Sequence, residues 1–133
     1  MDFTRENFSS GSPLEDKVGY SRVVKAGPFI FVGGTTSVQA DGSVYGEGSM
    51  YEQCKFIFKK MIGCLEDAGG KTEEVVRVKM YLTDMSQAGD ATKAYSEFFK
   101  EVKPLCTAVG IDKLFRPSQL AEIEIDAIKG AVC

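Results

Sequence analysis

Residues 19–34 read GYSRVVKAGPFIFVGG, and this stretch decides the fold. Two runs, 19–26 and 29–38, are rich in β-branched and aromatic side chains and are separated by Gly27-Pro28, a typical turn pair. The pattern predicts a β-hairpin. In the second run aromatic and aliphatic residues alternate, so both faces of the strand are apolar. We therefore expect this strand to be covered on both sides.

The rest of the chain alternates between helical and extended patterns. Apolar residues at steps of three and four indicate helices, and alternation at steps of two indicates strands. Gly69-Gly70 ends the first helix, and the residue before Pro104 ends the second. The predicted elements outside the hairpin are an edge strand at 3–8, helices at 50–68 and 87–102, and strands at 75–83, 105–111 and 120–129.

The predicted order is therefore β-β-α-β-α-β-β, preceded by the edge strand. Two helices that accompany one sheet lie on a single face of it, so we expect a two-layer α+β sandwich. The 133 residues are enough for one domain with a real core, and we assign residues 1–133 to a single domain. Residues 1–17 read as a polar N-terminal segment.

Composition excludes several classes of function. The net charge of −3 disfavours nucleic acid as a partner. No apolar run approaches the ~18 residues of a membrane span, and the polar, acidic start resembles no targeting peptide. We therefore expect a cytoplasmic protein without a membrane partner. The chain has no histidine, which removes Ser-His-Asp and Cys-His catalysis, and its four cysteines form no CxxC pair, which disfavours zinc.

One face of the predicted sheet carries charges on two strands. The residues expected there are Arg77, Lys79, Glu122, Glu124 and Asp126. Such a row is usually exposed to solvent. The alternative is an oligomer that covers this face, in which the carboxylates need cationic or hydrogen-bonding partners, with Arg77 and Lys79 as candidates. The residues by themselves leave both alternatives open.

Several segments in this order are similar to the YjgF/RidA family, also called Rid proteins. They are GYSRVVKAGPFIFVGG, LEDAGG, EEVVRVKMYLTD, AYSEFFKEVKP and EIEIDAI, and together they extend from about residue 18 to residue 129. The resemblance implies a chorismate-mutase-like fold and a homotrimer with the sheets in a central barrel. It also implies small-molecule ligands in clefts between subunits, and hydrolysis of imines or enamines without metal or cofactor. Some members carry an endoribonuclease label, to which a chain without histidine gives little support.

The resemblance also implies site residues. The family's cleft tyrosine falls on Tyr20, its Ser-Gly pair on Gly33-Gly34, and its helix asparagine near Thr92. The carboxylate that orders the attacking water falls on Glu124.

The family's Pro-Ala-Arg-Ser/Thr appears here as Pro104-Leu105-Cys106-Thr107, so the arginine that binds the substrate carboxylate is replaced by Cys106. Thr107 keeps the hydroxyl at the next position. The loss of a bidentate Arg–carboxylate contact costs roughly a hundredfold or more in affinity. The chain therefore resembles the arginine-lacking branch, for which hydrolysis of 2-imino acids is not implied.

Each of these positions also has a structural interpretation. Cys106 is a small apolar residue on a strand, a passive ligand contact, or a reactive thiol that needs a nearby cation. Arg116 on the following loop is a solvated side chain or the cation that replaces the family arginine. Glu124 pairs with a cation or activates water. Gly33 and Gly34 form a bulge or present backbone N–H groups to a ligand.

Two classes of function follow. The first is a cofactor-free hydrolytic deaminase that acts on a small imine or enamine, with Glu124 activating water. The second is a trimeric binding or sensor protein for small metabolites that has no turnover.

Overall fold

The computed structural model describes residues 2–133, so only Met1 of the expected domain lies outside it. Six strands form one sheet in the order β1-β2-β3-β6-β4-β5. Every pairing is antiparallel except that of β4 with β5. The strands are β1 (Arg5–Phe8), β2 (Val23–Ala26), β3 (Phe29–Thr35), β4 (Val75–Leu82), β5 (Leu105–Gly110) and β6 (Ala121–Ile128).

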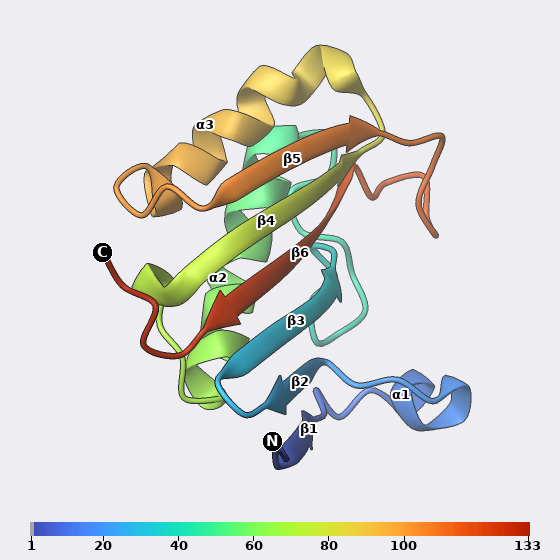
Figure 1. Ribbon diagram of the computed structural model, residues 1–133. Coiled ribbons are helices and arrows are strands. Elements are labelled where there is room, and N and C mark those ends of the chain that lie inside the picture. Colours follow the sequence, from blue (N-terminus) through green and yellow to red (C-terminus); the bar gives the residue numbers. More distant parts are fainter. Residues whose placement is uncertain (1) are drawn as a thin grey trace.

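Two long helices lie against one face of this sheet and leave the other face uncovered (Figure 1). The helices are α1 (Pro13–Val18), α2 (Met50–Asp67) and α3 (Ala88–Phe99), with short 3₁₀ turns η1 (Thr72–Glu74) and η2 (Met85–Gln87). The predicted two-layer α+β fold, its element order and its edge strand are confirmed. The trimeric barrel stays a prediction.

The core lies between the helices and the sheet. The predicted stripe of α2 is buried, and Phe58 on it packs in an aromatic cluster with Tyr95, Phe98 and Phe99 of the α3 segment. Gly69 follows the end of α2 with a φ of +90°, and the N–H of Gly70 donates to the carbonyl of Leu65 at 2.9 Å. The helix patterns therefore predicted the core-facing residues correctly.

The polar N-terminal segment contains the short helix α1, which begins at Pro13 and is capped by the Ser12 side chain. Two local predictions were wrong. The hairpin strands are shorter than expected, because β2 begins only at Val23 and a register shift between Val32 and Thr35 interrupts the pairing near the end of β3. The alternation in 75–83 predicts Val76 on the core face with Val78, but a second register shift makes Val75 the buried residue at the start of β4.

The second helix is also shorter than the predicted range 87–102. The turn η2 precedes it, and it ends at Phe99, whose carbonyl accepts hydrogen bonds from the N–H groups of Val102 and Lys103. Lys103 adopts a φ of +57°, which directs the chain out of the helix and into β5.

Gln53 is a fully buried polar residue on the core side of α2. Its Nε2 donates to the carbonyl of Ser118 at 2.8 Å and to that of Gly46 at 3.3 Å. Its Oε1 accepts from the N–H of Leu120 at 2.8 Å. One side chain therefore ties α2 to the loops 36–49 and 111–120.

Replacing Gln53 with Leu leaves these buried backbone groups without partners, and each such group costs about 1–3 kcal/mol. We expect the Gln53→Leu variant to lose on the order of 3 kcal/mol in free energy of unfolding, measured by urea denaturation. Lys59→Leu, an exposed position on the same helix, is the matched control and should change little. Equal stability of the two variants would contradict this role of Gln53.

Glu74 connects the turn before β4 with the residues that follow β6. Its carboxylate is 1% exposed and accepts from the N–H of Gly130 at 2.6 Å and from that of Lys71 at 3.0 Å. Lys129 lies 3.7 Å away. The hydrogen bond from Gly130 and the charge of Lys129 outweigh burial and lower the pKa of Glu74 below its usual 4.5.

Because the folded state holds this pKa down, Glu74 stabilises the fold above its unfolded pKa and loses that contribution as the pH falls through the lowered value. We expect the difference in unfolding free energy between the wild type and Glu74→Gln to be largest above pH 5. It should shrink as the pH drops below about 4.5. Denaturant titrations across this range measure it, and a difference independent of pH would refute the assignment.

Candidate functional site

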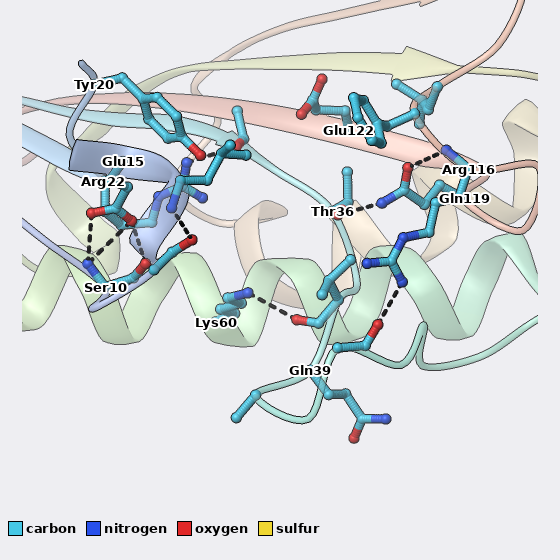
Figure 2. Close-up of a pocket in the computed structure, with 18 of the residues that line it drawn as sticks. Ser10, Glu15, Tyr20, Arg22, Thr36, Gln39, Lys60, Arg116, Gln119 and Glu122 are labelled. Atoms are coloured by element: carbon cyan, nitrogen blue, oxygen red, sulfur yellow. Dashed lines mark hydrogen bonds between the residues drawn. The ribbon is translucent and has the colours of Figure 1, made fainter. Parts of the chain in front are cut away.

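A cleft of about 1310 Å³ opens at one end of the sheet. Its walls come from the segment around α1, the start of β2, the loops 36–42 and 113–119, the outer side of α2, and β6. Figure 2 shows Arg22 near Tyr20 and Glu15 at one end, Arg116 with Gln119 at the other, and Lys60 on α2 between them. The cleft therefore gathers side chains from segments far apart in the sequence.

Three of the site residues predicted from the sequence line this cleft, namely Tyr20, Gly34 and Arg116. Arg116 is not simply solvated, because its Nη1 donates to the carbonyl of Gly42 in the opposite loop. Its backbone N–H donates to Oε1 of Gln119 at 2.9 Å. The loop arginine is thus held at the mouth of the cleft by contacts on two sides.

The two glycines form the irregular part of β3. The register with β6 shifts between Val32 and Thr35, so Gly33 and Gly34 lie in a bulge. The N–H of Gly33 donates to the carbonyl of Arg22 at 2.9 Å and is occupied in this structure. A Cβ on Gly34 would lie 3.1 Å from the carboxyl carbon of Glu122. Gly34 therefore leaves the space that the Glu122 side chain uses.

Glu124 lies on the uncovered face of the sheet, outside the lining of the cleft. Its Oε1 accepts a hydrogen bond from the hydroxyl of Tyr81 at 2.9 Å, and Lys79 is its direct partner in register. The bond to Glu124 raises the pKa of Tyr81, so the phenol stays a donor at neutral pH. Glu124 thus accepts a hydrogen bond from Tyr81 and lies opposite Lys79 on the neighbouring strand.

Glu122 connects the cleft with Glu124. It lines the cleft and lies two residues before Glu124 on the same face of β6. Burial raises the pKa of the Glu122 carboxyl, Arg22 opposes the shift, and the charge of Glu124 adds to it.

The other predicted residues lie at the opposite edge of the sheet. Thr107 on β5 is in register with Lys79 and faces the uncovered side. Cys106 pairs with the buried Val78 and therefore points toward the helix layer. Thr92 is exposed on α3, and its hydroxyl donates to the carbonyl of Gly89 at 3.1 Å.

Cys106 lines a small hollow with Arg77 and Lys79, but neither cation lowers the pKa of its thiol. Partial desolvation raises its pKa, and a hydrogen bond with Tyr95 only partly offsets that shift. Burial and this neighbour raise the pKa of Tyr95 to about 12. The environment keeps the thiol protonated at neutral pH, which favours the interpretation of Cys106 as a small apolar residue.

The predicted site residues therefore divide into two groups within one chain. Tyr20, Gly33 and Gly34 lie on the β2–β3 side of the central strand β6, and Cys106 and Thr107 lie on the edge strand β5. The strands β6 and β4 lie between β3, which carries the two glycines, and β5. One chain does not bring them together.

Sequence reasoning missed most of the lining of the cleft, including the two cations Arg22 and Lys60. Arg22 follows Tyr20 by two residues, and that spacing in an extended segment would have placed both on one side. Lys60 lies on the polar side of the helix pattern of α2. That pattern does not distinguish a lysine that lines a cleft from a lysine that is solvated.

Neither a metal cluster nor a membrane-spanning helix is found between residues 2 and 133. No three His, Cys, Asp or Glu side chains are grouped as metal ligands among these residues. None of the helices described is both long and apolar enough to cross a bilayer.

Relatives of known sequence match most of the chain. An uncharacterized protein of Streptomyces coelicolor, SCO2049, is 33% identical over 123 residues, which cover 92% of this chain and 91% of that protein. The mitochondrial protein mmf2 of Schizosaccharomyces pombe is 30% identical over 109 residues, covering 82% and 85% of the two chains.

Solved structures agree with these matches. Rv2704 from Mycobacterium tuberculosis, described as a member of the YjgF/YER057c/UK114 family, superposes with a TM-score of 0.84 at 32% identity. The match covers 94% of this chain and 99% of Rv2704. The profile of the family described as endoribonuclease L-PSP matches residues 12–129. The chain therefore belongs to the YjgF, or endoribonuclease L-PSP, family.

Proposed function

We propose that the protein is a homotrimer whose sheets form a central barrel and whose clefts between subunits bind small metabolites. The observation that carries this proposal is the separation of the site residues toward opposite edges of one sheet. A β5 edge from one copy that meets the β2–β3 side of the next would join the two groups. The family resemblance implies this arrangement.

The uncovered face of the sheet supports assembly independently. Phe31 is 44% exposed and Leu105 is 62% exposed, and both lie in the cross-strand row that contains Arg77 and Asp126. A third apolar residue of this face, Val109, is in register with Tyr81. An exposed surface of large apolar side chains, interleaved with charges of both signs, is typical of an interface.

The proposed chemistry is the hydrolysis of a small imine or enamine, with Glu124 as the base. Glu124 accepts a proton from water while the water oxygen bonds to the imine carbon, which gives a carbinolamine. This proton passes to the nitrogen and completes the neutral carbinolamine. Glu124 then accepts the hydroxyl proton and returns it to the nitrogen, the carbon–nitrogen bond breaks, and a ketone and ammonia leave. Tyr81, 2.9 Å from Glu124, fixes the carboxylate for this transfer. No net oxidation occurs, and the proposal includes no cofactor.

The alternative is a trimeric binding or sensor protein without turnover. The observation that favours it is Cys106, whose protonated thiol takes the position of the family's substrate-binding arginine. In both cases we propose a cytoplasmic protein that has neither nucleic acid nor membrane as a partner. The fission-yeast relative shows that the family also includes mitochondrial proteins.

A substitution on the uncovered face tests assembly. The wild type should elute with three times the protomer mass of 14.5 kDa in size-exclusion chromatography with light scattering. Leu105→Glu should shift the protein toward the protomer, because it removes a large apolar side chain from the proposed interface and adds one carboxylate per subunit that assembly would have to desolvate. Val18→Glu, at a position 66% exposed on α1, is the control that should remain trimeric. A wild type that elutes as a protomer would remove the basis of the proposal.

Glu124→Gln tests the chemistry. An amino acid together with a flavin-dependent amino-acid oxidase supplies imine, and the wild type should accelerate the release of ammonia. The variant should lose this acceleration by at least about a hundredfold while it still binds ligand, because the amide cannot accept the proton. Glu66→Gln, exposed near the end of α2, is the matched control. Full activity of Glu124→Gln would exclude the role of this carboxylate, and no acceleration by the wild type would favour the binding protein.

A further inference from the structure

The cleft carries more positive charge than the acidic chain around it. Its lining includes four cations, Arg22, Lys60, Lys113 and Arg116, against two carboxylates, Glu15 and Glu122, whereas the whole chain has a net charge of −3. Glu15 is 4% exposed and already accepts hydrogen bonds from Ser9 and Ser10. The excess of cations therefore attracts an anion to the cleft.

Arg22 is held in place by the bulge of β3. Its Nη1 donates to Oγ1 of Thr35 at 3.0 Å, and its Nη2 donates to the carbonyl of Gly34 at 2.9 Å. Thr35 is 2% exposed and is itself fixed, since its hydroxyl donates to the carbonyl of Gly33 at 2.8 Å. The guanidinium is thus oriented before any ligand arrives.

Part of the Arg22 guanidinium has no partner within the described chain. Its buried Nε makes no hydrogen bond, and only two of its five N–H groups are used by protein acceptors. Glu122 lines the same cleft, and the charge of Arg22 opposes the rise of its pKa. An oriented arginine with unused donors is suited to bind a carboxylate.

Lys60 supplies a second cation from the helix layer. It is half-buried, and its Nζ donates one hydrogen bond, to the carbonyl of Val38 at 3.0 Å. Burial and the neighbouring charge of Arg22 lower the pKa of Lys60. An anion between the two cations would offset both the repulsion and the desolvation.

Part of the cleft wall is apolar, beside polar side chains such as Thr36 and Gln119. Phe56, Leu114 and Phe115 line it together with the cations, and Phe115 is 96% exposed in the single chain. A ligand that satisfies both parts has one anionic end and an apolar body.

We propose that Arg22 and Lys60 bind the carboxylate of a small organic acid with an apolar body, and so replace the cation that strand β5 lacks at Cys106. The inference rests on the proposed function, in which small metabolites bind in clefts between subunits, and it takes the cleft of one chain as part of such a site. In this proposal the carboxylate of the ligand is bound by residues next to β2 and on α2, and not by a residue of β5. Small acids then remain ligands of a chain without the family arginine.

The test uses hexanoate and hexanamide, which share an apolar body and differ in charge. In titrations followed by protein NMR, the wild type should bind hexanoate at least about tenfold more tightly than hexanamide, as a hydrogen bond to a charged group predicts. Arg22→Gln should lose most of this preference and leave the affinity for hexanamide unchanged. Arg5→Gln, an exposed arginine on β1, is the matched control and should behave as the wild type.

Lys60→Gln keeps the test decisive if Arg22→Gln fails to fold, because Lys60 makes a single hydrogen bond to a loop. This variant should lose at least about threefold in affinity for hexanoate only, as weakened charge pairing at a partly buried site predicts. Its control is Lys59→Gln, one residue away and exposed.

A wild type without preference for hexanoate, or a folded Arg22→Gln or Lys60→Gln variant that keeps the full preference, would overturn the proposal. The trimer mass and ammonia release are measured without hexanoate. They show separately whether the proposed function fails.

Discussion

The position of β6 in the centre of the sheet is the constraint on which the rest of the structure depends. This last strand of the sequence inserts between β3 and β4, and its residues alternate strictly between buried and half-buried. Four of its five aliphatic residues face the helices, and its three carboxylates and Ile128 face the other way. A slip of one residue would place Glu122, Glu124 and Asp126 in the core, so the register is fixed by the cost of burying unpaired charge.

This register also determines the chemistry of the uncovered face. Lys79 is brought opposite Glu124, Arg77 opposite Asp126, and the hydroxyl of Tyr81 reaches Glu124. Burial raises the pKa of Asp126, while the two cations oppose that shift. Charges of opposite sign lie side by side on this face, so its desolvation would not leave a carboxylate without a cationic neighbour. An interface between copies requires this property.

The cleft depends on the same strand through Glu122 and on the bulge of β3. Gly34 leaves room for that carboxylate, and the bulge carbonyl of Gly34 and hydroxyl of Thr35 orient Arg22. Gln53 fastens both loops that border the opening. The cleft therefore depends on the core. The buried side chains of Thr35 and Gln53 hold the arginine and the loops that shape it.

The sequence by itself determined the order of the elements, the two helix stripes and the charged face, because these depend on local periodicity that each segment carries alone. The resemblance pointed to Tyr20 and Gly34, and the loop position of Arg116 pointed to a replacement cation. Only the tertiary structure decided the bulges at Gly33-Gly34 and Val75, and it alone brought Arg22 and Lys60 into one cleft. Those features depend on which strands pair and on how a helix packs across them, and contacts between residues distant in sequence leave no periodic signal.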